Sequence, residues 1–393
     1  AGKPLASYQQ CFWKVQVWDV NDQPSAWSEP AVWSMGILQD NEWNACWLCF
    51  PKADTREGNA PDKPAPLPIF RRGFSIGKEI KQARIYVCGL GFYELRLNGK
   101  KVGDAMLDPG WTNYKKTCPY STYDVTEQLR AGENALGVML GNGMYNVTGG
   151  RYVKYTGSFG PPTFILKLRI EHADGGVTEI VSDESWRGHA GPIVFSCIYG
   201  GEDYDARQEQ PGWDAPGFAD ASWSPAQVGD GPGGKLVSQM APPLRVIQPM
   251  EPVRMNTPRP GITMYDLGQN FSGIPWIQVQ GPRGSWIRVT PSELITDDGL
   301  ANQSASGGPH NYTYTLKGEG AETWHPRFTY YGFRYLQVES GPEENPPQLL
   351  RIMGLFTRHS AERAGEFTCS DELYNQIHEL IDWSVGSNLQ SVL

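Results

Sequence analysis

The 393-residue chain holds 45 glycines and 31 prolines, and 12% of its residues are aromatic. It is too long for one ordinary domain, and its turn-rich composition is typical of short strands, so we expect an all-β protein of two to four domains. The net charge of −9 argues against nucleic acid as a partner, and no apolar run approaches the roughly 20 residues that a membrane span needs.

The first 40 residues predict a single hairpin. Residues 12–19 alternate between apolar and polar side chains, as a half-buried strand does, and a turn follows at 21–24. Residues 25–30 then return toward the start. This is too little chain for a domain, so we expect residues 1–40 to be a partial fibronectin- or immunoglobulin-like unit.

Two larger β units follow along the chain. Residues 83–87 and 93–97 alternate cleanly, and Asn98-Gly99 is a strong two-residue hairpin signal, so residues 41–245 are predicted to form a jelly-roll sandwich with a long surface loop near 51–68. Pro242, Pro243 and Pro252 mark a boundary. Further alternating runs between 276 and 338 predict a second antiparallel sandwich over 246–362.

The last segment, residues 363–393, predicts the one convincing helix. Leu373, Ile377, Leu380 and Ile381 lie on one face at a spacing of 3.6 residues, and Ser370 is a suitable N-cap. A lone amphipathic helix after a long run of strands suggests the first element of a helical domain. We expect its apolar face to pack against that missing domain or against a second copy of the chain.

Three stretches resemble one family of bacterial glycoside hydrolases. Residues 91–145 with 201–213, residues 265–273 with 326–335, and residues 365–392 are similar to successive parts of the bacterial α-L-rhamnosidases of family 78. The resemblance implies an N-terminal jelly roll, a second β-sandwich and the opening of a catalytic (α/α)₆ barrel. In the family, an acidic signature follows the third stretch, and this chain ends before it, so no catalytic residue is carried over and we expect a truncated protein.

The resemblance implies an inverting mechanism, in which an acid and a base lie roughly 6.5–9.5 Å apart with a water between them. The chain is therefore predicted to be the non-catalytic β portion of an enzyme that removes terminal α-L-rhamnose from glycosides or polysaccharides. The alternative is a carbohydrate-binding or scaffold module without its own hydrolase activity. The family further implies a bacterial periplasmic or extracellular location, with a cytoplasmic one left open.

Some jelly rolls related to the first one bind rhamnose with the help of calcium, and catalysis itself needs no cofactor. Calcium takes six to eight oxygen ligands, and aromatic faces stack on pyranose rings. The competing interpretation is that such aromatic residues are sandwich core. The candidate sugar-binding residues are Trp111, Tyr114, Asn142 and Tyr145, and the candidate metal ligands are Asp108, Asn113 and Asn146.

The densest acidic group is Glu202 with Asp203 and Asp205. A pair of carboxylates can serve glycoside hydrolysis, but 43 acidic residues make such pairs easy to find by chance. We interpret this group as a surface turn, with Asp205 or Arg207 in a structural ion pair.

Overall fold

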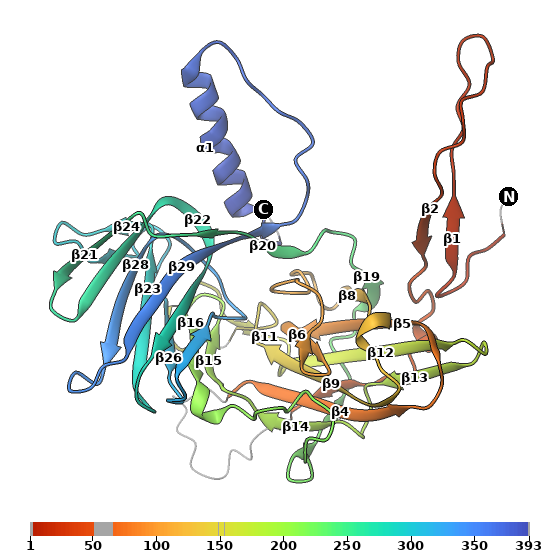
Figure 1. Cartoon of the computed structure of the whole chain (residues 1–393), viewed down its shortest axis with the longest axis horizontal. Helices are drawn as coiled ribbons and strands as arrows, with labels where there is room; N and C mark the ends of the chain where they lie inside the picture. Colours follow the sequence, from red (N-terminus) through yellow and green to blue (C-terminus); the bar gives the residue numbers. More distant parts are fainter. Residues whose placement is uncertain (1–2, 51–65, 148, 153, 392–393) are drawn as a thin grey trace.

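The computed structural model describes residues 3–50, 66–147, 149–152 and 154–391. Strands dominate this part of the chain, and one α-helix stands near the C-terminus, as Figure 1 shows. The predicted all-β class with a single C-terminal helix is therefore confirmed. The predicted surface loop lies for the most part outside the described residues.

The first sandwich consists of two facing sheets with an apolar core between them. Asn98 and Gly99 have φ angles of 52° and 82°, which confirms the predicted tight hairpin between β6 (Phe92–Leu97) and β7 (Lys100–Lys101). One sheet contains β3 (Trp47–Cys49), β5 (Ile80–Leu90), β8 (Thr117–Asp124), β12 (Thr163–His172), β13 (Val177–Val181), β18 (Gln227–Gly229) and β19 (Lys235–Ser238). The other contains β4 (Pro68–Ile76), β6 (Phe92–Leu97), β7 (Lys100–Lys101), β9 (Gly132–Gly141), β14 (Arg187–Ala190) and β17 (Ser224–Pro225).

The second unit is one ten-stranded sheet that curls around its own core. Two of its strands, β15 (Ile193–Cys197) and β16 (Gly201–Asp205), come from the segment that the sequence assigned to the first sandwich. Strand β16 pairs in parallel with β26 (Asn311–Thr315). The two units are therefore interleaved along the chain as well as being in contact with each other. The other strands are β20 (Leu244–Met250), β21 (Arg254–Arg259), β22 (Ile262–Gln280), β23 (Trp286–Ser292), β26 (Asn311–Thr315), β27 (Ala321–Trp324), β28 (Tyr331–Gly341) and β29 (Gln348–His359).

Short elements complete the described fold. They are the strand pairs β10 (Asn146–Val147) with β11 (Gly157–Ser158) and β24 (Leu294–Ile295) with β25 (Ala301–Asn302), and the 3₁₀ turns η1 (Asp40–Glu42), η2 (Thr126–Gln128) and η3 (Ala206–Gln208).

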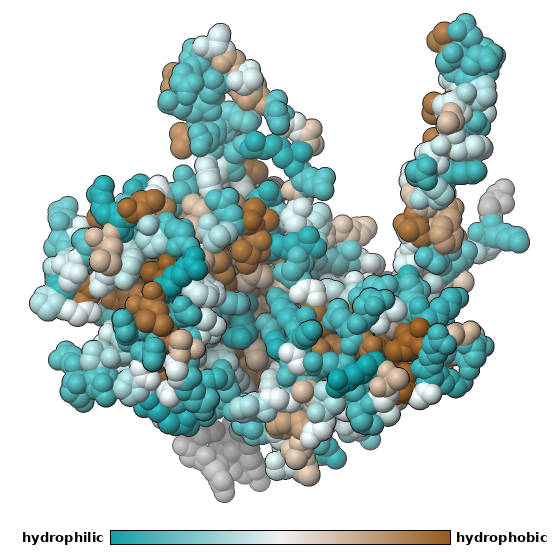
Figure 2. Space-filling model, viewed as in Figure 1, coloured by the Kyte–Doolittle hydropathy of each residue, from teal (hydrophilic) through white to brown (hydrophobic). Residues whose placement is uncertain are grey.

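The N-terminal hairpin and the helix both project from the β body (Figure 1). The hairpin pairs β1 (Gln10–Trp13) with β2 (Ala31–Ser34), and it exposes apolar side chains such as Phe12 and Trp18. Figure 2 shows such apolar side chains along both projections. Both elements therefore carry apolar surface that the described part of the chain leaves uncovered.

Helix α1 (Glu372–Asn388) begins one residue later than predicted. Asp371, not Ser370, is the N-cap, and its carboxylate accepts a hydrogen bond of 3.0 Å from the backbone N–H of Leu373. Only the C-terminal end of the helix touches the curled sheet, where Trp383 packs on Phe356. The predicted apolar face is exposed, from 41% at Ile377 to 66% at Leu380. No helix among the described residues is long and apolar enough to span a membrane.

Candidate functional site

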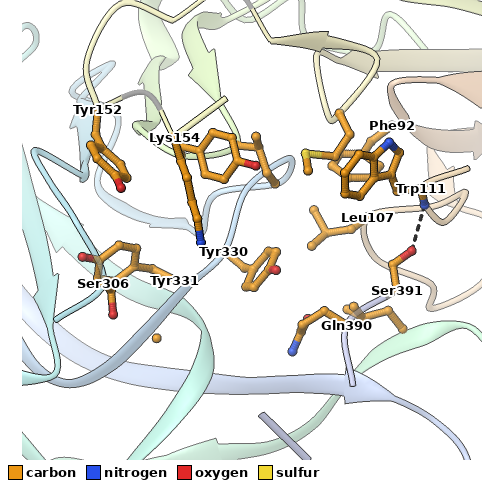
Figure 3. A pocket seen from close by; sticks show the side chains of 15 residues that line it. Phe92, Leu107, Trp111, Tyr152, Lys154, Ser306, Tyr330, Tyr331, Gln390 and Ser391 are labelled. Carbon is orange, nitrogen blue, oxygen red and sulfur yellow. Dashed lines mark hydrogen bonds between the residues drawn. The ribbon is translucent and has the colours of Figure 1, made fainter. Parts of the chain in front are cut away.

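A pocket of about 400 Å³ lies where the first sandwich, the curled sheet and the segment after α1 meet. We call it the junction pocket. Its volume is in the range of small-ligand sites. Aromatic side chains form much of its wall, and Lys154 is the one charged side chain among the described residues that line it. Figure 3 shows Trp111 at one end and Tyr152 with Ser306 at the other. The aromatic wall residues are Phe92, Trp111, Tyr152, Tyr199, Tyr330 and Tyr331.

The segment after α1 is fastened to both units and so closes one side of the pocket. The backbone N–H of Trp111 donates to the Ser391 hydroxyl at 2.8 Å. The buried Gln390 amide donates to the Ser272 hydroxyl at 2.6 Å and to the Thr357 carbonyl at 2.7 Å. A Cβ at Gly110 would lie 2.8 Å from the Ser391 hydroxyl oxygen, so a larger residue here would displace that hydroxyl. These contacts hold the Trp111 loop against the C-terminal segment.

The opposite wall is held from within the curled sheet. The hydroxyl of Tyr331, at the start of β28, donates to the Gly307 carbonyl at 2.5 Å. The His310 ring packs 4.4 Å from the Tyr331 ring, and burial lowers the pKa of His310 to about 3. This histidine is therefore neutral at ordinary pH, and it supports the wall as an aromatic ring without adding charge.

Of the predicted sugar-binding residues, Trp111 alone lines the junction pocket with an exposed side chain, 43% of which is accessible. Tyr114 and Tyr145 are buried, with rings 5.2 Å apart, and both pack against Phe159. This corrects their prediction as stacking surfaces, because a ring inside the core has no free face. Asn142 is also buried, and its amide donates to the Ser196 carbonyl at 2.9 Å.

The predicted metal ligands do not form a calcium site in this arrangement. The Asp108 carboxylate is buried and accepts hydrogen bonds from the hydroxyls of Tyr93 at 2.6 Å and Ser121 at 2.5 Å. Asn146 donates to Asn142 at 2.9 Å and accepts from Ser158 at 2.7 Å. Asn113 is exposed and accepts from the backbone of Lys115. These oxygens serve the fold, and they do not fit an ion that needs six to eight ligands.

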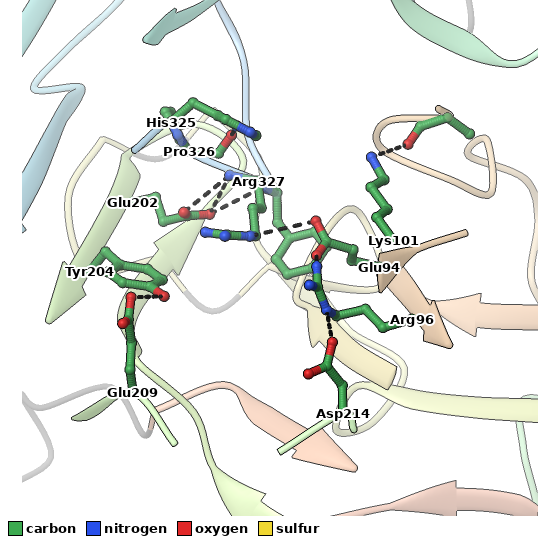
Figure 4. A network of polar contacts seen from close by, with 12 residues as sticks. Glu94, Arg96, Lys101, Glu202, Tyr204, Glu209, Asp214, His325, Pro326 and Arg327 are labelled. Carbon is green, nitrogen blue, oxygen red and sulfur yellow. Dashed lines mark hydrogen bonds and ion pairs between the residues drawn. The ribbon is translucent and has the colours of Figure 1, made fainter. Parts of the chain in front are cut away.

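A second, polar hollow of about 220 Å³ lies at the same boundary, beside the Arg327 side chain. Figure 4 shows Arg327 between residues of β6 and residues of β16. Its Nε lies 3.5 Å from Glu94, and its guanidinium lies 5.2 Å from the Tyr204 ring. We call this set of charged and polar residues the Arg327 network, with the members Glu94, Arg96, Glu202, Tyr204, Glu209, Asp214, Lys317 and Arg327.

The acids of the Arg327 network all have partners. Arg96 binds both Glu94, at 2.8 Å, and Asp214, at 2.5 Å. Glu209 binds Lys317 at 2.8 Å and accepts from the Tyr204 hydroxyl at 2.9 Å. Buried charges persist in proteins when they are paired. Because each carboxylate of the network has a protein donor, we interpret the network as a structural connection between the two β units.

Glu202 is fully buried in strand β16, which corrects its prediction as part of a surface turn. Its carboxyl accepts from the backbone N–H groups of Arg327, at 3.1 Å, and Phe328, at 3.0 Å. Burial raises the pKa of Glu202 to about 7. A raised pKa suits a general acid, but a side chain with no accessible surface cannot reach a glycosidic oxygen. The structural ion pair expected of Asp205 or Arg207 is present, and it joins these two residues to each other at 2.8 Å.

Sequence reasoning missed the tyrosines and the lysine of the junction pocket. Tyr330 and Tyr331 fall within a stretch that carried the family resemblance, so a signal was present, although it gave them no role. Lys154 stands in a polar connection with no motif around it. Only the folded chain brings it opposite Tyr330 and Tyr331 (Figure 3).

Comparison with known proteins gives the family. Residues 78–248 match the family model described as alpha-L-rhamnosidase N-terminal domain, and residues 256–357 match the bacterial alpha-L-rhamnosidase concanavalin-like domain. Residues 1–39 match the Rha78A-like N-terminal immunoglobulin domain. The chain belongs to the bacterial α-L-rhamnosidase family.

Whole-chain relatives agree with this assignment. An α-L-rhamnosidase of Formosa agariphila is 35% identical over 100% of this chain and 43% of its own length. The structure of α-L-rhamnosidase from Dictyoglumus thermophilum covers 99% of this chain with a TM-score of 0.90 and 40% identity, and the match takes in 44% of that chain. A Streptomyces avermitilis α-L-rhamnosidase, solved in complex with L-rhamnose, has a TM-score of 0.90, 25% identity, and coverage of 100% of this chain and 54% of its own. The chain spans about two fifths of the curated relatives that it matches.

Proposed function

We propose that this chain is the non-catalytic β portion of an inverting α-L-rhamnosidase that removes terminal α-L-rhamnose from glycosides or polysaccharides. The observation that carries the proposal is the match along the whole chain to an α-L-rhamnosidase more than twice as long. The paired acids of the Arg327 network and the inaccessible Glu202 support a non-catalytic role. The same proposal places the protein in the bacterial periplasm or outside the cell.

We further propose that the junction pocket is where this portion contacts the glycan. Trp111 offers an accessible indole for the apolar face of a pyranose ring, and Ser391 and Tyr330 carry hydroxyl groups for hydrogen bonds with the sugar. The pocket is also built jointly by the first sandwich, the curled sheet and the segment after α1. This makes it sensitive to how the two β units and the C-terminal segment sit together.

Two measurements on the purified 393-residue chain test the proposal. We expect no turnover of a chromogenic α-L-rhamnoside, and turnover that disappears on mutation of a carboxylate in the chain would refute the non-catalytic role. Calorimetry with rhamnose-containing oligosaccharides should show binding that Trp111→Ala weakens about tenfold. Trp33→Ala is the matched control, because Trp33 is 44% exposed on the distant hairpin. Equal affinity of the Trp111→Ala and Trp33→Ala variants for the oligosaccharide would refute the proposal that the junction pocket binds the glycan.

A further inference from the structure

Lys154 gives the junction pocket a charge that no described lining residue balances. The fifteen lining residues include no aspartate or glutamate. The neighbouring cation, Arg151, is paired with Asp203 and also donates to the Asn311 carbonyl at 3.0 Å. Lys154 has no ion pair or side-chain hydrogen bond among the described residues, and Figure 3 shows it reaching toward the side that Tyr330 and Tyr331 line.

Glu293, an acid behind the wall, is already occupied by neutral donors. Glu293 lies behind Ser306, whose hydroxyl donates to it, and its other oxygen accepts from the Asn270 amide at 2.8 Å. Glu293 itself does not line the pocket. The positive charge of Lys154 therefore faces the cavity without a carboxylate beside it.

Lys154 is an exposed side chain, so its ammonium is accessible to a ligand in the cavity. Its attraction for an anion is that of a solvent-accessible charge, which salt screens. The chain as a whole carries a net charge of −9, so general surface electrostatics would repel an anion. Binding of an anion at this place would depend on Lys154.

We propose that the junction pocket selects an acidic glycan, in which a carboxylate or a sulfate ester on a sugar binds Lys154 while a neighbouring ring stacks on Trp111. This inference rests on the proposed sugar-binding role of the pocket and adds its specificity. A uronic acid and a sulfated sugar present the same chemistry to an ammonium group, namely oxygen acceptors with a full negative charge.

The test compares three probes by calorimetry on the 393-residue chain. They are a disaccharide of L-rhamnose and D-glucuronate, its carboxyl-reduced neutral counterpart, and a sulfated methyl α-L-rhamnoside. The wild-type chain should bind one or both anionic probes at least about tenfold more tightly than the neutral one. Whichever anionic probe gains affinity identifies the acidic group.

Variants separate the lysine from the rest of the pocket. Lys154→Gln should abolish the preference for the anionic probe, whereas Lys154→Arg should keep the preference. Lys100→Gln is the matched control, because it removes an exposed lysine of the same sandwich that lies outside the pocket. The preference should also fall as salt is raised.

Two results would overturn the inference in different ways. Equal binding of anionic and neutral probes, with both weakened by Trp111→Ala, would refute acid selection and leave the proposed sugar-binding role standing. Absence of binding by all three probes would refute both proposals.

Discussion

The junction pocket and the Arg327 network lie at the same boundary between the two β units, yet they handle charge in opposite ways. In the network, each carboxylate has a protein donor, and the Glu202 carboxyl is sealed from solvent. In the pocket, one lysine faces an aromatic cavity with no acid among the lining residues. Charges that are satisfied inside the protein hold a fold together, whereas a charge left open in a cavity is available to a ligand.

The largest effect should come from breaking the network. Arg327→Met removes the cation beside Glu94 and leaves that buried carboxylate with less compensation, so unfolding free energy should fall by about 3–5 kcal/mol. Chemical denaturation measures this. The double variant with Glu94→Gln should recover part of the loss, because the uncompensated charge is gone. A fall of less than about 1 kcal/mol would mean that the network does not tie the units together.

The pH dependence of stability should reveal Glu202. Burial raises its pKa from 4.5 to about 7, so the folded state holds this proton more tightly than the unfolded state does. The stability that protonated Glu202 contributes is fully present below about pH 4.5. It is lost as the pH rises through 7, so the free energy of unfolding falls by about 3 kcal/mol over this range. Glu202→Gln should flatten this part of the stability curve. Parallel curves for wild type and variant would contradict the raised pKa.

The apolar face of α1 extends the same comparison from charge to hydrophobic surface. Leu373, Ile377, Leu380 and Ile381 are exposed, and each buried aliphatic side chain is worth roughly 1.5–3 kcal/mol. In the isolated chain, we expect this face to pair with a second copy. Light scattering should show a concentration-dependent dimer that Leu373→Asp with Ile377→Asp converts to a monomer. If the wild-type chain and the double variant are both monomers, this apolar face does not pair with a second copy of the chain.

The smallest effect concerns calcium. Because the oxygens of Asp108, Asn142 and Asn146 are engaged in hydrogen bonds within the protein, calcium should shift the melting temperature by less than about 1 °C. Melting curves with calcium chloride and then with a chelator check this. A larger shift that the chelator reverses and that Asp108→Asn abolishes would show that the ion rearranges these residues.

Local patterns in the sequence were enough to predict the elements of this protein. The two-residue alternation of strands, the Asn98-Gly99 turn and the 3.6-residue stripe of the C-terminal helix are set by neighbours along the chain. The helix start was displaced by one residue because Ser370 and Asp371 can both cap, and the structure uses the carboxylate.

The tertiary structure alone decided which of those side chains are free. Tyr114 and Trp111 stand three residues apart with similar chemistry, yet one is core and the other lines the junction pocket. Lys154, Tyr330 and Ser391 come from distant parts of the sequence and meet only when the two units and the C-terminal segment pack together. Burial depends on contacts across the fold, and no local pattern in the sequence records them.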